Sequence, residues 1–322
     1  MLRVESSTRR RRARLLGVLT VAVLAVGAAA CAPAPPTSPV YDSACNGTMV
    51  ELPQATVASN AVTELSGLAA SRTNAGVWWG HNDSGTAPDA ITVFAIGDAG
   101  QSYAQFTLNG VANTPTTDWE DIAVGPGPTP GVSYVYVGDI GGNISPRHTV
   151  LVHRFPEPLV DTSKPPQPTA GIAAETLTFT YPGTETHDAE ALISDPATGE
   201  LFLITKTLSP NDPARVFRAG ANLSAGSTTE LEQVATLPYP LITGADVTAA
   251  GDVVAVRTYF SVLLFARPAG TSLADAFGQP MCFGSVPAKL AQFESIAFTP
   301  DGRGYVTAAE GLHPTLFHFA AP

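Results

Sequence analysis

Residues 188–206 read DAEALISDPATGELFLITK. Two apolar runs, 191–193 and 201–204, stand on either side of the turn-forming residues Pro-Ala-Thr-Gly. Strand-like runs separated by such a turn are typical of a β-hairpin. Glu190 leads into the first run, and Lys206 ends the second.

This hairpin unit recurs along the chain, at intervals of roughly 50–70 residues. The first runs start at Ser66, Glu120, Glu190, Ala245 and Glu294. The second runs end at Asp83, Asp139, Lys206, Arg257 and Glu310. Third runs follow in every unit and fourth runs in most, so we predict an all-β fold: a β-propeller of about five four-stranded blades.

Two alternatives to five blades remain open. A two-sheet sandwich also uses short strands, but it does not predict five similar units with matching polar positions. A degenerate sixth blade could lie in residues 156–175 or 266–292.

The sequence also indicates how the ring of blades closes. The fifth unit has no fourth run because the chain ends at Pro322, whereas residues 48–53 form a strand-like segment before the first unit. We expect this N-terminal strand to complete the last blade, which would cover the open edge. Cys45 would then start the closing strand, with Cys282 in the neighbouring blade. We predict a disulfide between them; two buried thiols are the alternative.

The N-terminus has the pattern of an export signal. Six arginines precede an apolar run that is shorter than the ~20 residues of a membrane span, and Ala28-Ala29-Ala30-Cys31 follows. We predict a signal peptide at 1–30, a Pro-rich tether at 31–44 and the propeller at 45–322. A lipid on Cys31 would make a cell-envelope lipoprotein whose membrane contact is that lipid, and ordinary cleavage would make a secreted protein.

The charge balance excludes some functions. The chain carries 28 acidic and 17 basic residues, and the basic ones are concentrated in the signal segment. So acidic a surface repels phosphate backbones, which argues against a nucleic-acid partner. The sequence also has no Walker, His-Glu-x-x-His or Gly-x-Ser-x-Gly motif.

The repeat predicts an acidic ring around the propeller axis. Glu120, Glu190 and Glu294 occupy one repeat position on the innermost strands, and Asp118 and Asp188 lie two residues upstream. Like charges brought together in a buried place repel, so a guest or a partner must neutralise them. Ca²⁺ accepts six to eight oxygen ligands, and we predict a site formed by Glu120, Asp139, Glu190 and Glu294. Polar packing without catalysis is the alternative.

Three residues are candidates for catalysis. Lys206 and Arg257 could hold an anionic group beside the metal, or could pair with the glutamates and do nothing more. His187 precedes Asp188 and is the best-placed general base, although it could be an ordinary loop histidine.

Three segments resemble blades of the bacterial secreted β-propellers of the phytase-like and esterase-like group: residues 188–206, 119–123 (WEDIA) and 293–297 (FESIA). The resemblance implies a calcium-dependent propeller that cleaves phosphate or carboxylate esters. The five units differ from the six blades of phytase propellers, and Ser66 and Ala245 interrupt the acidic ring.

Two functions follow from these observations. The first is an exported, cation-binding hydrolase that acts on a small anionic molecule. The second is a non-catalytic propeller with a structural ion that binds or scaffolds a component of the cell envelope.

Overall fold

A computed structural model describes Met1 and residues 38–322, except 84–90, 143–144, 165 and 289–291. The chain divides into two units, with the boundary after Pro33. The predicted signal peptide and Cys31 lie outside the described residues. No helix in the described part of the chain is long and apolar enough to cross a membrane.

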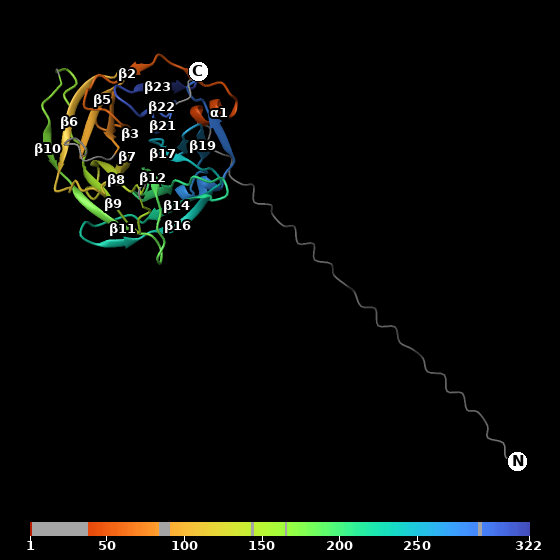
Figure 1. Ribbon diagram of the computed structural model, residues 1–322. Helices are drawn as coiled ribbons and strands as arrows, with labels where there is room; N and C mark the ends of the chain where they lie inside the picture. The colour runs from red at the N-terminus through yellow and green to blue at the C-terminus, as the bar shows by residue number, and fades with distance from the viewer. Residues whose placement is uncertain (2–37, 84–90, 143–144, 165, 289–291) are drawn as a thin grey trace. The chain divides into compact units, whose positions relative to one another are not determined.

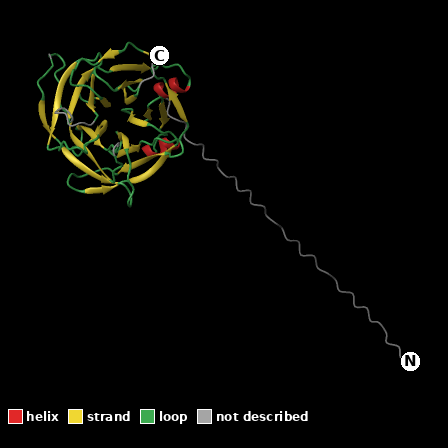
Figure 2. Cartoon of the chain, viewed as in Figure 1, coloured by secondary structure: helices red, strands yellow, loops and turns green. Residues whose placement is uncertain are grey.

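The second unit is a five-bladed β-propeller, as the repeat predicts (Figure 1). Each blade is one sheet whose first strand faces the axis, and these inner strands contact one another in a ring (Figure 2). The inner strands are β3 (Leu65–Ala70), β7 (Trp119–Pro126), β12 (Ala189–Ser194), β17 (Ile242–Val247) and β21 (Phe293–Phe298).

The remaining strands complete the blades, and the outermost strand of blade 1 and of blade 2 comes from a later part of the chain. Blade 1 adds β4 (Val77–Asn82), β5 (Thr92–Gly97), β6 (Ser102–Asn109) and β10 (Ala170–Ala173). Blade 2 adds β8 (Ser133–Asp139), β9 (Thr149–Pro156), β11 (Glu175–Thr180) and β15 (Thr228–Glu230). Blade 3 adds β13 (Leu201–Thr205), β14 (Ala214–Ala219) and β16 (Glu232–Leu237). Blade 4 adds β18 (Val253–Thr258), β19 (Val262–Ala266) and β20 (Met281–Gly284).

The two segments that could have held a sixth blade belong to existing blades. In residues 156–175, β10 runs parallel to β6 and extends blade 1. Residues 266–292 supply β20 and the short 3-10 helix η1 (Leu273–Gly278) to blade 4. An added outer strand covers a sheet edge that would otherwise expose unpaired backbone groups.

The N-terminal strand closes the ring in blade 5, as predicted. This blade adds β22 (Gly304–Ala309), β23 (Thr315–Ala320), β1 (Val50–Glu51) and β2 (Ala55–Thr56). Both β1 and β2 pair antiparallel with β23, for example Val50 with Ala320. The first strand, β1, and the last strand, β23, therefore share one sheet.

The predicted disulfide joins Cys45 to Cys282, with the two Cα atoms 5.0 Å apart. Cys45 ends the helix α1 (Pro39–Cys45) and does not start the closing strand as expected. Residues 39–44 of this helix fall in the predicted tether. Val40 of this helix is fully buried against β19, β20 and their neighbours. The disulfide consequently ties the segment that enters blade 5 to the outer strand of blade 4.

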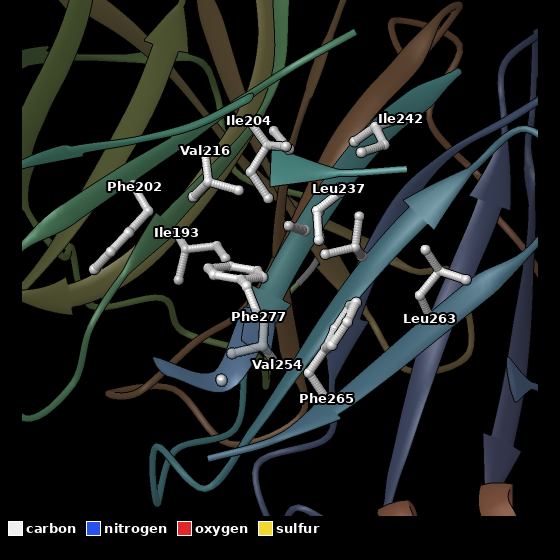
Figure 3. Packing of buried hydrophobic residues seen from close by; sticks show 14 of the residues in the cluster. Ile193, Phe202, Ile204, Val216, Leu237, Ile242, Val254, Leu263, Phe265 and Phe277 are labelled. Carbon is white, nitrogen blue, oxygen red and sulfur yellow. The ribbon is translucent and has the colours of Figure 1, made fainter. Parts of the chain in front are cut away.

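The apolar core lies between blades. The cluster in Figure 3 joins the faces of blades 3 and 4, with Phe202 and Ile204 from β13 and Leu263 and Phe265 from β19. Phe277 of η1 packs edge-on against Phe265, with ring centroids 5.8 Å apart. Similar clusters between other blades hold the inner strands at fixed distances from the axis.

Candidate functional site

Every inner strand has a β-bulge at the same point. The extra residue is Glu120 in β7, Glu190 in β12, Thr243 in β17 and Glu294 in β21. In β3, Ser66 and Gly67 together stand opposite one residue of β4. A bulge interrupts the alternation of a strand and re-aims its side chains.

These bulges correct the predicted ring in one blade. Thr243, and not Ala245, is the blade 4 counterpart of Glu120, Glu190 and Glu294. The upstream position in that blade is consequently Leu241, whose carbonyl accepts the N–H of Tyr259. A shift of two residues preserves the apolar–polar alternation of a strand. The sequence pattern therefore fits an alignment on Ala245 as well as one on Thr243.

The bulge residues fill the axis instead of lining an open channel. Ser66, Glu120, Glu190, Thr243 and Glu294 are all at most 4 % exposed. The Ser66 hydroxyl donates to the Glu120 carbonyl at 2.6 Å, and the Thr243 hydroxyl donates to the Phe293 carbonyl at 3.0 Å. The two neutral members of the ring thus join neighbouring blades, while the three glutamates bring buried carboxyl groups to the axis.

Two carboxylate triads meet at Glu120. One comprises Asp83, Asp118 and Glu120, and the other comprises Glu120, Asp188 and Glu190. Within each triad, one oxygen from every residue lies within 4.8 Å of the others. Asp83 follows β4, while Asp118 and Asp188 precede β7 and β12, so three blades supply these oxygens. All are hard ligands of the kind that Ca²⁺ prefers.

The electrostatics of the triads favour neutralisation. Burial, followed by the charges of Glu190, Asp83 and Asp118, raises the pKa of Glu120 well above its usual range. Burial also raises the pKa of Asp188, against the opposing effect of a hydrogen bond from the Gly142 N–H at 2.7 Å. A positive charge placed here would attract the carboxylates and relieve their mutual repulsion.

Lys206 supplies a positive charge on one side of the triads. Its Nζ lies 2.7 Å from Glu190 Oε1 and 5.0 Å from the centroid of the Tyr259 ring. Burial raises the pKa of Glu190 well above its usual value, and Lys206 opposes this shift. Lys206 neutralises part of the cluster, and its contact is with the Glu190 carboxylate.

Asp139 and Arg257 lie away from the position that Lys206 occupies. In blade 3, Lys206 directly follows the residue of the second strand that pairs with the inner strand just before its bulge. The residues in the same position of the other blades are Asp83, Ile140, Tyr259 and Glu310. Asp139 instead accepts hydrogen bonds from Arg147 Nη1 at 2.9 Å and from the Asp118 N–H at 3.0 Å.

Arg257 belongs to the packing between blades 4 and 5. Its side chain is fully buried, and its guanidinium carbon lies 4.7 Å from the centroid of the Phe293 ring. Burial lowers the pKa of Arg257 to about 10. Its Nε and Nη1 atoms have no hydrogen-bond partner among the described residues. The ring contact of Arg257 is therefore with Phe293 of blade 5.

His187 and Glu294 also lie outside both triads. His187 Nε2 lies 2.9 Å from Glu185 Oε2, and the His187 ring packs against Tyr181 with centroids 4.6 Å apart. Glu294 Oε1 accepts a hydrogen bond from Gln292 Nε2 at 3.1 Å. Of the predicted metal ligands, only Glu120 and Glu190 belong to the triads found among the described residues.

Gly141 makes room for the carboxylates. A Cβ atom at this position would overlap Glu120 Oε1 and lie 2.6 Å from Asp118 Oδ2. The Gly-Gly pair after β8 is visible in the sequence, but its contact with Glu120 and Asp118 arises only when β7 and β8 pair. Asp118 and Asp188 could be identified from the sequence, because each lies two residues before a glutamate of the repeat.

Searches with this chain found structural but not sequence relatives. No protein-family model matches it, and no curated protein is significantly similar. One similar solved structure is a streptogramin B lyase, with 10 % sequence identity over 84 % of this chain and 98 % of that one and a TM-score of 0.41. A second is a glutaminyl cyclase from Myxococcus xanthus, with 14 % identity over 84 % of this chain and 95 % of that one and a TM-score of 0.42. A third is a gluconolactonase from Xanthomonas campestris, with 14 % identity over 91 % of this chain and 96 % of that one and a TM-score of 0.46. The five-bladed architecture of this chain follows from its own sheet topology.

Proposed function

We propose that this chain is an exported β-propeller that binds a divalent cation, Ca²⁺ in the first instance, at its axis. The observation that carries the proposal is that Glu120 belongs to two carboxylate triads at once. Asp83, Asp118, Glu120, Asp188 and Glu190 would hold the ion. Their oxygen-only, irregular arrangement suits Ca²⁺, which tolerates varied geometry, better than Mg²⁺, which requires an octahedron.

The finer proposal is a hydrolase for small phosphate or carboxylate esters. A bound Ca²⁺ would supply positive charge that polarises an ester oxygen. Lys206 is the residue of this chain positioned to assist, because its Nζ lies beside the site at Glu190. When a cation neutralises Glu190, the ammonium group of Lys206 becomes available to an anionic ligand.

A non-catalytic role is the second candidate, and one observation favours it. The three residues with predicted catalytic roles do not converge: Lys206 pairs with Glu190, His187 bonds to Glu185, and Arg257 packs on Phe293. In this role the ion is structural, and the propeller binds a component of the cell envelope. Export is supported by the Cys45–Cys282 disulfide, since disulfides persist in oxidising compartments. Lipid attachment at Cys31 remains part of the proposal.

The cation site is tested with Glu120→Gln, and Glu294→Gln is the matched control at the same bulge position of another blade. Ca²⁺ should raise the Tm of the wild-type protein and of Glu294→Gln. At a Ca²⁺ concentration one hundred times the Kd, the free energy of unfolding should increase by about 2.7 kcal/mol. Glu120→Gln should lose this shift, and its Tm in EDTA should exceed that of the wild type because repulsion is relieved. The proposal fails if Ca²⁺ leaves the wild-type Tm unchanged or if Glu120→Gln responds as the wild type does.

A panel of phosphate and carboxylate esters, assayed with Ca²⁺ and with EDTA, separates the two roles. Calcium-dependent turnover that is lost in a folded Glu190→Gln variant supports the hydrolase. A protein that chelation destabilises, but that turns over none of the esters, is a non-catalytic propeller.

A further inference from the structure

Asp121 directly follows Glu120 in β7 and is fully buried. Its Oδ1 accepts the N–H of Ile122 at 2.8 Å. Its Oδ2 accepts the N–H of Leu192 in β12 at 2.8 Å and the N–H of Ala245 in β17 at 3.1 Å. One carboxyl group therefore connects blades 2, 3 and 4.

The inner strands explain why these N–H groups need an acceptor. Each inner strand pairs with the second strand of its blade, and its other edge faces the axis. Backbone groups on such an edge have no strand partner, and a buried N–H without a partner is costly. Asp121 supplies the missing acceptor to two blades at once.

The other blades leave the space that Asp121 fills. The residues that follow the bulge elsewhere are Gly67, Ala191, Gly244 and Ser295. These positions are closely packed, since a Cβ at Gly67 would lie 2.7 Å from the Ile122 nitrogen and a Cβ at Gly244 would lie 2.6 Å from the Glu294 carbonyl oxygen. Four small residues and one aspartate thus occupy a position that admits one carboxyl group.

The hydrogen bonds of Asp121 lie close in sequence to the glutamates of the triads. Asp121 is the residue next to Glu120, and Leu192 lies two residues after Glu190. Glu120 and Glu190 belong to one triad, and their charges repel. The bond between Asp121 and Leu192 opposes the separation of β7 and β12 that this repulsion favours.

We propose that Asp121 is the positioning residue of the cation site: it holds β7, β12 and β17 at the spacing at which Glu120 and Glu190 share one ion. The inference rests on the proposed function. It goes beyond that function by assigning the geometry of the site to a residue that does not itself belong to either triad.

Asp246 provides a matched control in the same fold. Its Oδ1 accepts the N–H of Val247 at 2.8 Å, and its Oδ2 accepts the N–H of Phe298 in β21 at 2.7 Å. It is a largely buried carboxyl group that joins blades 4 and 5, whereas both triads lie on blades 1 to 3. Replacing it removes the same kind of inter-blade bond without touching the strands that carry the triads.

The test is calorimetric titration of Ca²⁺ into the wild-type protein, Asp121→Asn and Asp246→Asn, with the Tm of each measured in EDTA. Both substitutions should lower the Tm, because each replaces an oxygen acceptor by an amide. Asp121→Asn should weaken Ca²⁺ binding by about tenfold or more, as loss of an outer-shell partner does. Asp246→Asn should bind within about twofold of the wild type. Equal affinity of the wild type and a folded Asp121→Asn, or equal weakening in both variants, would overturn the inference.

A second measurement uses the wild-type protein alone and applies even if Asp121→Asn does not fold. Amide hydrogen exchange at Leu192 and Ala245 should slow on addition of Ca²⁺ by a larger factor than exchange at Phe298. Equal changes at the three amides would reject the role of Asp121. If Ca²⁺ added to the wild type gives no heat, the cation site itself is rejected. If the wild type binds Ca²⁺ and Asp121→Asn binds it equally well, only the role of Asp121 is rejected.

Discussion

Acidic side chains serve different purposes at the axis of this propeller, according to what surrounds them. Glu120 and Glu190 gather in triads with other carboxylates, Asp121 accepts backbone N–H groups, and Asp139 pairs with Arg147. A buried carboxylate needs compensation, and hydrogen bonds, an ion pair or a guest cation can each provide it. The triads gather carboxylates from three blades within reach of one another, which is why they form the candidate site.

The titration of two axial carboxyl groups predicts how stability depends on pH. Burial, together with Glu294, raises the pKa of Glu310 to about 8, and burial raises the pKa of Asp246 to about 6. Both values exceed those of the unfolded chain, so the folded state favours the protonated forms. This stabilisation is complete below the unfolded values and is lost as pH rises through 6 and then 8.

We therefore expect the Tm in EDTA to fall between pH 5 and pH 8.5, by a few degrees, since about 1 kcal/mol corresponds to roughly 2–4 °C in a domain of this size. Glu310→Gln should flatten the part of this decline near pH 8. Scanning calorimetry across the pH range checks both statements. A Tm that rises over this interval, or a decline that Glu310→Gln leaves unchanged, would contradict them.

At the scale of elements, the site depends on how bulges and loops meet. The bulge in β7 directs Glu120 towards the axis, and the loop after β8 passes next to it at Gly141. Hairpin pairing is what brings these two segments together. The sequence predicted both strands and the glutamate, but a bulge shifts the alternation by one residue, and nothing in a period-two pattern marks that shift.

Replacing Gly141 tests whether this close approach matters. In Gly141→Ala, the new methyl group should displace the carboxylates of Glu120 and Asp118, so the Tm increase produced by Ca²⁺ should largely disappear. The flexible ends of these side chains can move, so the protein should remain folded. Gly220→Ala is the control, because a Cβ there meets no atom within 4 Å. Thermal unfolding with and without Ca²⁺ gives the answer, and an undiminished calcium response in Gly141→Ala would show that the ligands lie elsewhere.

At the scale of the whole molecule, the two ends of the chain close the ring. Strand β1 joins β23 in blade 5, and the Cys45–Cys282 disulfide anchors the preceding helix to blade 4. The cysteines are 237 residues apart in sequence, so the cross-link restricts nearly the whole unfolded propeller. For a loop of this length the chain-entropy estimate is about 5 kcal/mol.

Removing the cross-link should therefore weaken the whole propeller. The double variant Cys45→Ser, Cys282→Ser should unfold at a lower denaturant concentration, with a loss of up to about 5 kcal/mol in unfolding free energy. Wild-type protein in reducing buffer should show a similar loss, which separates the missing bond from the effect of the serine side chains. Urea unfolding followed by fluorescence provides the measurement. Identical midpoints for the oxidised wild type and the double variant would mean that β1 closes the ring without help.

The five-bladed propeller, its closure by the N-terminal strand and the pairing of Cys45 with Cys282 were predicted from the amino-acid sequence. These follow from features of the sequence: a hairpin repeat, one unit that lacks a strand, and one cysteine before the closing strand with another in the neighbouring blade. The residues that meet at the axis could be identified only in the folded chain. Thr243 takes the position expected of Ala245, Asp83 and Asp118 join Glu120, Arg257 packs between blades, and Asp121 connects three of them. The physical reason is that each of these contacts depends on the frame in which the bulged strands pair, and on side chains from different blades that approach one another only when the ring is closed.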